Sequence, residues 1–463
     1  MVVSDTAMSE TAVSETVEIN SRYDMKFFDR EKETIILRDI KELSMDNAQF
    51  TVLTGRRRVG KTWLVTHAYD PDEMLYFFVG RKSETELCKG FSKEIEEKLH
   101  IPVLGAPERF SDIFEFLMKY SQSHHITLFI DEFQDFIRVN KSVFSDMQRI
   151  WDLYKENSKM NLIVGGSIYS LISRIFKDEK EPLYGRQSRF LRIKPFRTSV
   201  IKGILGAYNP DFMPDDLLTM YMLTGGVAKY VSSLIDNKAY TSDSMIEKAV
   251  SEDSPFITEG KNILLEEFGK DSAVYFSILS AIASGRNTRN EIETAVGKEV
   301  GGYLTKLEDE YNLVSKHLPV LTPNSQKNVH YELNDMFFKF WFRFIHRYNY
   351  MLEIGKYDKL REVIQRDYNT YSGHVLEYYF KQKLAEESDI TRIGNWWDRK
   401  GENEIDIITE NELDNRLTFY EVKRQAENIS IGILKAKAEA FFTKNKIASK
   451  YDIEYKGLTL EDM

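Results

Sequence analysis

Between residues 26 and 198, short apolar runs alternate with longer segments whose apolar residues recur every three or four positions. The short runs, 50–53, 127–130 and 161–164, have the length and composition of buried strands, and the longer segments have helical periodicity. Such alternation is typical of an α/β sheet with helices on both faces. We therefore expect an α/β domain over 26–198, with a first helical run that ends near Leu43.

After Pro195 the pattern becomes mostly helical, and residues 199–260 are expected to form a helical lid. Residues 261–349 contain three helical segments followed by two strand-like runs that can pair as a hairpin, which predicts a winged helix-turn-helix. An aromatic helix over 335–350 ends this segment. Because its rings fall on most faces, we expect it to pack in a core rather than to stack on bases.

The expected recognition helix of the winged unit, residues 301–309, carries Lys306, and Lys298 and Glu299 lie just before it. The last two residues of the helix and the residue after it are acidic. Glu308, Asp309 and Glu310 would repel the phosphates of DNA. The pattern therefore favours a contact with a protein partner, or with another part of this chain, over the reading of bases.

A phosphate-binding motif follows the first strand-like run: residues 55–62 read Gly-Arg-Arg-Arg-Val-Gly-Lys-Thr. This is a complete G-x-x-x-x-G-K-[ST] sequence between a strand and a helix. Its glycines let successive N–H groups face a β-phosphate, its lysine reaches the β- and γ-phosphates, and its threonine hydroxyl completes a Mg²⁺ shell. The motif predicts that a nucleoside triphosphate is bound by Gly55, Arg56, Arg57, Arg58, Val59, Gly60, Lys61 and Thr62.

Two further strand ends carry candidate groups for hydrolysis. The run 127–132 ends in Asp131 and Glu132. The aspartate would hold Mg²⁺, and the glutamate would orient and deprotonate the attacking water. The run 161–167 ends in Ser167, which suits a sensor beside the γ-phosphate, although a strand that ends in a glycine turn looks the same.

Arg186 is a candidate to read or stabilise the γ-phosphate, either within its own subunit or on a neighbour. It lies close to Arg189, Arg192 and Lys194. A solvated or nucleic-acid-facing basic patch is therefore the alternative interpretation of this arginine.

The C-terminal part, residues 350–463, contains a second group of patterned segments. Residues 404–408 and 419–423 alternate like strands, with a turn between them. Helical segments precede and follow the two strands at 371–384 and 431–442. We expect a small α/β domain here.

Carboxylates and a lysine can converge in this C-terminal domain. Residues two apart on a strand face the same side, so Glu421 and Lys423 point together, and Asp406 can join them from the neighbouring strand. Such oxygen ligands, with Glu377 as a further one, would bind Mg²⁺ or Mn²⁺ and support phosphodiester cleavage, with the lysine positioning the nucleophile. The alternative is a solvated β-hairpin, because Glu-x-Lys on a strand is common by chance.

Length and composition set outer limits. A chain of 463 residues predicts two to four domains. No apolar stretch approaches the ~20 residues that cross a bilayer, no secretory signal is evident, and a single cysteine, Cys88, suits a reducing interior. We therefore expect a cytoplasmic protein without membrane contact. Residues 1–25, acidic and rich in Ser and Thr, are expected to be disordered.

The net charge of −10 counts against a broad cationic surface for nucleic acid. A local positive groove remains compatible with this balance. DNA binding is therefore expected only through a confined site.

In their order along the chain, these motifs resemble the archaeal-type and bacterial AAA+-like P-loop ATPases of the STAND group. The resemblance is to the subfamily whose C-terminal domain, of unknown function, resembles the restriction-endonuclease-like PD-(D/E)xK nucleases. The matching segments are Phe28–Glu31, Gly55–Thr62, Phe129–Phe133, Gly165–Ser167, Leu183–Arg186, Thr224–Gly226, Asn334–Asp335, Phe340–Trp341, Glu404–Asp406 and Glu421–Lys423.

The resemblance implies ATP with Mg²⁺ as ligands, nucleotide-driven rearrangement and assembly into a homo-oligomer. It also implies a helical lid, a winged helix-turn-helix and a C-terminal α/β nuclease-like domain, beginning near residues 199, 261 and 350. Two positions depart from the family pattern. Val227 stands where a proline often follows the glycine pair, and Ile405 stands where a proline precedes the aspartate.

Two functions follow from these observations. The first is an ATPase that couples its nucleotide state to a C-terminal nuclease-like domain acting on DNA, with a second Mg²⁺ or Mn²⁺ in that domain. The second is a nucleotide-dependent switch or scaffold whose C-terminal domain binds a protein partner without cleavage. The intact Asp406, Glu421 and Lys423 set favours the first, and the acidic balance favours the second.

Overall fold

The computed structural model describes residues 25–102, 105–268, 272–322, 329–399, 401–445 and 451–463. The chain folds into two compact units. The N-terminal unit comprises Asp29–Pro195 with Asp309–Asn312, and the C-terminal unit comprises the other described residues. The tail expected to be disordered, 1–25, lies outside the described residues apart from Met25. None of the helices in the described ranges combines the length and the hydrophobicity that a bilayer crossing requires.

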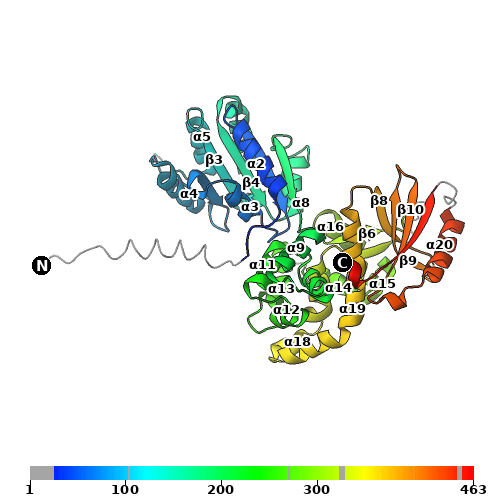
Figure 1. Ribbon diagram of the computed structural model, residues 1–463. Helices are drawn as coiled ribbons and strands as arrows, with labels where there is room; N and C mark the ends of the chain where they lie inside the picture. The colour runs from blue at the N-terminus through cyan, green and yellow to red at the C-terminus, as the bar shows by residue number, and fades with distance from the viewer. Residues whose placement is uncertain (1–24, 103–104, 269–271, 323–328, 400, 446–450) are drawn as a thin grey trace. The chain divides into compact units, whose positions relative to one another are not determined.

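The N-terminal unit is built on a five-stranded parallel sheet in the order β2-β3-β4-β1-β5 (Figure 1). Its strands are β1 (Gln49–Gly55), β2 (Met74–Phe78), β3 (Ile126–Asp131), β4 (Met160–Gly166) and β5 (Arg189–Ile193). Its main helices are α2 (Glu31–Leu43), α3 (Lys61–Ala68), α4 (Glu84–Leu99), α5 (Phe110–Tyr120), α6 (Phe136–Val139), α7 (Ser142–Tyr154) and α8 (Tyr169–Lys177). The expected α/β architecture is confirmed.

Helices cover both faces of this sheet, which explains the continuous apolar runs. Phe50 and Val52 of β1 join a core with residues of α4, α5, α7 and α8. The intervening Leu53 is equally buried, and α2 and α3 pack against β1. A strand that is buried on both faces has no solvent-facing positions, so its sequence does not alternate.

The C-terminal unit is mostly helical and contains two small sheets. Its helices are α9 (Thr198–Tyr208), α10 (Pro214–Thr224), α11 (Ala228–Asp236), α12 (Ser242–Ala249), α13 (Pro255–Phe268), α14 (Ser272–Ala283), α15 (Arg289–Val296), α16 (Gly301–Asp309), α17 (Met336–Phe340), α18 (Asn349–Glu353), α19 (Tyr357–Ala385) and α20 (Ile431–Asn445). Its strands are β6 (Val314–His317), β7 (His330–Leu333), β8 (Arg392–Trp397), β9 (Glu404–Asn411), β10 (Arg416–Val422) and β11 (Asp452–Leu458).

Helices α14 to α16 precede the antiparallel pair β6-β7, the element order on which the winged helix-turn-helix prediction rests. The start of α15 is capped as expected. Thr288 Oγ1 accepts a hydrogen bond from Glu291 N, and Thr288 N donates to Glu291 Oε2, a reciprocal capping box.

The second sheet has the order β11-β10-β9-β8, with β10 and β11 parallel and the other pairs antiparallel. Helices α19 and α20 lie on opposite sides of it (Figure 1). Its core includes Trp396, Phe419 and Phe441, whose rings meet edge to face. Tyr420 pairs with Ile407, so the neighbouring Glu421 lies across from Asp406.

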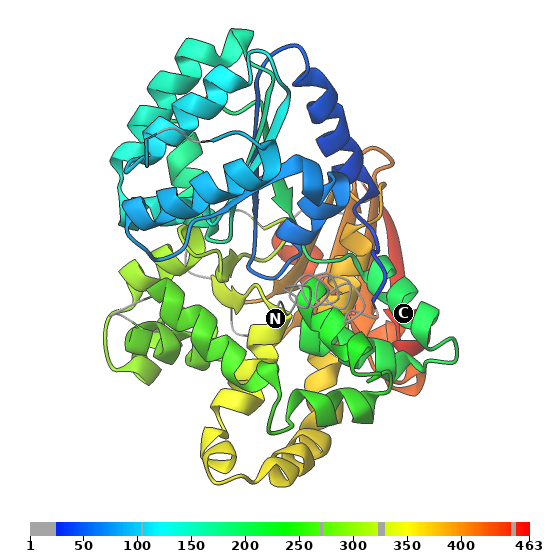
Figure 2. The same cartoon turned by 90° about the vertical axis from the view of Figure 1, so that its left-hand side faces the viewer.

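Helices of the predicted lid pack on the helix that leads into this sheet. Both α9 and α10 contact α19 (Figure 2). The rings of Tyr221 and Tyr379 are 5.3 Å apart, and Tyr221 Oη donates to Gln382 Oε1 at 2.9 Å. The predicted lid, winged unit and nuclease-like segment therefore share one compact unit.

The aromatic helix expected over 335–350 is instead divided into α17, a π-helical segment (Trp341–His346) and α18. Trp341 packs so tightly on Gly260 that a Cβ there would lie 2.4 Å from the indole, and its Nε1 donates to Ile257 O at 3.0 Å. The π-helical segment, whose turn is wider than that of an α-helix, begins at this buried tryptophan. The expected core packing is confirmed, because the buried rings are those of Phe337, Phe338, Phe340, Trp341, Phe342 and Phe344.

The sequence patterns do not predict strands β2, β5, β8 and β11 or the first half of α19. Strand β8 contains Gly394 and a register shift, and β11 is mostly polar, so neither shows a clear strand pattern. Helix α19 begins at Tyr357 rather than at Tyr371. Its first half shows little apolar periodicity, because only Leu360 and Ile364 are buried before Ser372.

Gly226 adopts a φ of +76°, and a Cβ there would lie 2.5 Å from Phe196 O. Gly226→Ala is expected to lower the free energy of unfolding by roughly 2 kcal/mol or more, since left-handed strain adds to a backbone clash. Gly285→Ala is the matched control, with φ +90° and nothing within 4 Å, and should cost only the strain of about 1–2 kcal/mol. Urea unfolding compares them, and equal losses would contradict the close contact.

Candidate functional site

The phosphate-loop sequence lies between β1 and α3, at the carboxyl end of the parallel sheet. A Cβ on Gly55 would lie 2.5 Å from Ile193 O, and Gly60 has a φ of +95°, so both positions need glycine. Lys61 is the first residue of α3 and is buried. Its Nζ donates to Gly55 O at 3.0 Å and to Arg56 O at 3.3 Å, which folds the side chain back over the loop.

Asp131 meets Thr62 at the end of β3. Thr62 Oγ1 donates to Asp131 Oδ2 at 2.7 Å, and Glu132 N donates to Asp131 Oδ1 at 2.9 Å. Tyr76 Oη, from the neighbouring strand β2, also donates to Asp131 Oδ2, at 3.3 Å. Sequence analysis misses Tyr76 because nothing in the sequence indicates that β2 pairs with β3.

The Glu132 carboxylate is held by two donors. Ser167 Oγ, just after β4, donates to Glu132 Oε2 at 2.7 Å. Gln134 Nε2 donates to the same oxygen. The structure thus brings Ser167 to the glutamate expected to activate water, while Gln134 is a partner that sequence analysis does not find.

The charges at this edge of the sheet are coupled. Burial lowers the pKa of Lys61, and the negative charges of Glu132 and Asp131 oppose that decrease. Burial, followed by the charge of Asp131, raises the pKa of Tyr76, so this phenol stays protonated and continues to donate. The site therefore combines a lysine with two carboxylates whose charges reach it, the charge pattern that a Mg²⁺–phosphate complex complements.

The residues present fit a nucleoside triphosphate with Mg²⁺. The Thr62 hydroxyl and the Asp131 carboxylate are hard oxygen donors placed side by side, as Mg²⁺ prefers. The N-terminus of α3 follows the loop and favours an anion. Arg57, Arg58 and Val59 complete the loop between the two glycines.

Arg186 lies away from this group within its own chain. Its guanidinium donates to Tyr184 O at 2.8 Å and to Asp152 Oδ2 at 3.1 Å. It precedes β5, whose first residue, Arg189, pairs with Thr51 near the start of β1. Arg186 is therefore near the amino ends of the strands, while the phosphate loop is at the carboxyl ends, so the structure does not bring it to the phosphates of its own subunit.

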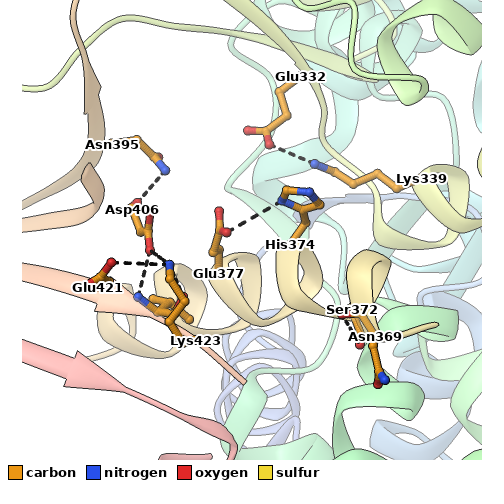
Figure 3. A network of polar contacts seen from close by, with 11 residues as sticks. Glu332, Lys339, Asn369, Ser372, His374, Glu377, Asn395, Asp406, Glu421 and Lys423 are labelled. Carbon is orange, nitrogen blue, oxygen red and sulfur yellow. Dashed lines mark hydrogen bonds and ion pairs between the residues drawn. The ribbon is translucent and has the colours of Figure 1, made fainter. Parts of the chain in front are cut away.

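In the C-terminal unit, Asp406, Glu421 and Lys423 converge at one end of the second sheet (Figure 3). Lys423 Nζ lies 3.4 Å from Asp406 Oδ2 and 3.7 Å from Glu421 Oε1. Val422 N donates to Asp406 Oδ2 at 2.8 Å, and Ser430 N donates to Glu421 Oε2 at 3.1 Å. The convergence arises because the end of β10 pairs with the start of β9.

Glu377, on α19, lies beside this group, with its carboxylate turned toward His374 (Figure 3). Burial raises the pKa of Glu377, and the charge of Asp406 raises it further. His374, whose Nδ1 lies 3.7 Å from Glu377 Oε1, lowers it. Burial and then Glu377 and Asp406 also raise the pKa of Glu404, the first residue of β9. Glu404 is thus a fourth carboxylate that sequence analysis does not single out, although it lies two residues from Asp406.

The expected three-carboxylate metal cage is not formed. In the described part of the chain, no group of three His, Cys, Asp or Glu side chains is spaced to hold a metal ion. The Lys423 ammonium lies within 4 Å of an oxygen of both Asp406 and Glu421, and its single charge offsets part of their negative charge. An open site of these two carboxylates still has the right chemistry, since Mg²⁺ is often bound by one or two carboxylates, waters and substrate phosphate oxygens.

Comparison with known proteins identifies two family regions. Residues 27–234 match a family described as an ATPase domain predominantly from Archaea, and residues 341–437 match a family of archaeal and bacterial proteins of unknown function. An uncharacterized protein of Methanocaldococcus jannaschii is 30% identical over 407 residues, 86% of this chain and 87% of that protein. The N-terminal match supports an ATP-binding ATPase domain.

Two solved structures share the fold. A Walker-type ATPase of Pyrococcus abyssi, 21% identical, covers 68% of this chain and 96% of its own, with a TM-score of 0.53. The Aeropyrum pernix ORC2 protein, in ADPNP–ADP complexes and 15% identical, covers 74% of this chain and 98% of its own, with a TM-score of 0.50. At these identities the likeness shows a P-loop ATPase fold.

Glu377→Gln is expected to stabilise the protein at neutral pH while preserving the shape of the side chain. An acid whose pKa is raised on folding contributes stability below its unfolded pKa of 4.5 and loses it as the pH rises through the folded pKa. The substitution should therefore raise Tm at pH 8 by about 1–2 °C, roughly what 1 kcal/mol gives for a unit of this size, and have little effect at pH 4. Glu439→Gln, at an exposed position of α20, is the control. Equal Tm values for wild type and Glu377→Gln at pH 8 would contradict the cost of burying the ionised carboxylate.

Proposed function

This chain belongs to the same family as the Methanocaldococcus jannaschii protein, and on that premise we propose that it is a Mg²⁺-dependent ATPase which couples its nucleotide state to cleavage of DNA by its second sheet. The N-terminal family match and the fold support the ATPase part. The convergence of Asp406, Glu421 and Lys423 supports the nuclease part.

ATP hydrolysis would use groups at the carboxyl ends of β1, β3 and β4. Lys61 would exchange its loop carbonyl partners for β- and γ-phosphate oxygens. Thr62 and Asp131 would hold Mg²⁺, which neutralises charge on the phosphates. Glu132 would accept a proton from water as the water oxygen bonds to the γ-phosphorus and the bond to the bridging oxygen breaks. Ser167 and Gln134 hold that carboxylate in place.

DNA cleavage would use the open carboxylate site of the second sheet. Asp406 and Glu421 would hold Mg²⁺ or Mn²⁺, which supplies an activated water and stabilises charge on the scissile phosphate. Lys423 would position the attacking water and donate to the phosphate. The water oxygen bonds to phosphorus, the bond to one sugar oxygen breaks, and that oxygen takes up a proton from solvent.

Glu377 has a supporting role in this proposal. Glu377 would accept the proton that the attacking water loses, because a carboxylate with a raised pKa is a stronger base. Arg186 is proposed to act on the nucleotide of a neighbouring copy, because it lies at the opposite end of the strands from its own phosphate loop. Such a role would require the homo-oligomer that the family resemblance implies.

The second candidate function is a nucleotide-dependent switch that binds a protein partner through its C-terminal unit. One observation favours it: a basic side chain beside the recognition-helix candidate α16 is itself paired with a carboxylate of that helix. Lys316 Nζ lies 2.6 Å from Glu308 Oε2. A phosphate would have to compete with that carboxylate.

Glu132→Gln is expected to retain ATP binding and to lower the rate of ATP hydrolysis on the order of 10²-fold or more, because water loses its proton acceptor. Lys61→Ala should weaken binding itself. The control is Glu156→Gln, at an exposed position of the same unit. Binding of a fluorescent ATP analogue and phosphate release measure the two steps, and unchanged turnover in Glu132→Gln would reject the assigned role.

Asp406→Asn and Lys423→Met are expected to abolish cleavage of plasmid and linear DNA in Mg²⁺ or Mn²⁺ while ATP hydrolysis continues. Asp452→Asn, an exposed position at the start of β11, is the control. Running Lys61→Ala beside them tests whether cutting depends on nucleotide. If wild type and Asp406→Asn leave DNA equally intact while ATP is hydrolysed, the nuclease is rejected and the partner-binding switch takes its place.

A further inference from the structure

A cavity of about 660 Å³ lies inside the C-terminal unit, beside the proposed cleavage site. Side chains from β7, the π-helical segment, α19, β8 and β9 line it. Glu377 and Glu404 belong to its wall, and the charge of Asp406 acts on both of them, so the cavity borders the acidic group around Asp406. The proposed reaction does not otherwise use this space.

A second part of the cavity wall is basic. Lys339 Nζ donates to Glu332 Oε1 at 3.0 Å and lies 3.3 Å from the centre of the Tyr378 ring. Lys381 Nζ donates to Asn395 Oδ1 at 2.5 Å. His317 Nε2 lies 3.1 Å from Glu332 Oε2. Glu332 is therefore one carboxylate beside two ammonium groups and an imidazole, and Arg343 and Arg347 line the cavity as well.

The buried state of these groups is electrostatically costly. Burial lowers the pKa of Lys339 to about 8 even though Glu332 opposes the change. Burial also opposes ionisation of Glu332, yet Lys339, His317 and Lys381 hold its pKa at about 2. An anion would have to share Lys339 with Glu332, whereas Lys381 donates to the neutral amide of Asn395. An anion that meets Lys381 would therefore recover part of the desolvation cost of that ammonium group.

The side-chain amide of Asn395 forms hydrogen bonds with both the basic and the acidic part of the cavity wall. Asn395 Oδ1 accepts from Lys381, and Asn395 Nδ2 donates to Asp406 O at 2.6 Å. Figure 3 shows Glu332 and Lys339 on one side and Asp406 and Lys423 on the other, with Glu377 between them. A ligand that reaches both walls needs an anionic group for the lysines and a metal-binding oxygen for the carboxylates.

A nucleotide within a nucleic-acid strand has both features, since successive phosphates are carried along one flexible backbone. A cavity of this volume is the size of a small-molecule pocket and accommodates a nucleotide unit. A base pair within an intact duplex does not enter such a pocket without being separated. Tyr378 and Trp397 lie in the wall, where Lys339 covers one face of Tyr378 and His330 stacks on Trp397, so a base would meet the remaining ring surface.

We propose that the cavity receives one unpaired nucleotide, with a phosphate against Lys339 and Lys381, so that the strand cut at Asp406 is unpaired rather than held in a duplex. The inference rests on the proposed nuclease function for the cut itself. The recognition is of a nucleoside phosphate, which can belong to a strand or to a free nucleotide. The pocket predicts a strand, because a second phosphate is needed at the acidic wall.

The test measures binding of full-length protein by fluorescence anisotropy, with Ca²⁺ in place of Mg²⁺ so that DNA stays intact. The probes are a labelled oligothymidylate, its blunt duplex with oligodeoxyadenylate, and unlabelled thymidine monophosphate as competitor. Wild type should bind the single strand about tenfold or more tightly than the duplex, and Lys381→Met should lose about tenfold for the single strand. Lys381→Arg should restore most of that affinity.

Arg347→Gln is a second variant, since Arg347 is exposed at the cavity wall and its loss does not threaten folding. It should also weaken single-strand binding. Lys359→Met, an exposed lysine of α19 paired with Glu362 outside the cavity, should not. Unchanged melting temperatures establish that each variant is folded.

Equal affinity for strand and duplex, or single-strand binding that survives both Lys381→Met and Arg347→Gln, would overturn the inference. If thymidine monophosphate competes as well as the unlabelled strand does, the claim that the bound nucleoside phosphate belongs to a strand is overturned. Cleavage that requires Asp406 but shows no strand preference leaves the proposed function standing without the pocket. Lys381-dependent strand binding with no cleavage in any metal leaves the pocket standing without the nuclease.

Discussion

Carboxylates buried at the ends of strands require nearby positive charge, and in both units a lysine provides it. Lys61 is affected by the charges of Asp131 and Glu132, and Lys423 lies within 4 Å of two carboxylates. Uncompensated burial of an ionised group costs several kcal/mol, so a nearby ammonium group offsets part of the cost of placing carboxylates at these strand ends. The same ammonium groups are suited to meet phosphate oxygens, which explains how one arrangement can serve stability and chemistry.

The two units reach this arrangement through different sheets. In the parallel sheet every strand ends at the same edge, so the loop after β1, Asp131 after β3 and Ser167 after β4 meet without long side chains. In the mixed sheet the end of β10 lies beside the start of β9, which places Glu421 across from Asp406. Strand direction therefore decides which sequence positions become neighbours.

Helix α19 contributes both to helix packing and to the cavity wall in the C-terminal unit. Its residues Tyr379 and Gln382 pack against α10, while Glu377 and Lys381 line the cavity. Residues on one rigid helix keep fixed spacings, so the acidic and basic groups of the cavity wall cannot move independently. Arg424, after β10, also donates to Ser372 on this helix, at 2.8 Å.

The sequence by itself determined the phosphate loop, the α/β order and the strand positions of Asp406, Glu421 and Lys423, because glycine spacing, apolar runs and period-two alternation are local properties. It did not determine that Tyr76 and Gln134 join the carboxylates, that Arg186 lies at the far end of the strands, or that Glu404 and Lys381 share a cavity. Those facts depend on strand order and helix packing between segments distant in the chain. Only the tertiary structure sets such pairings, since no local pattern records which strands become neighbours.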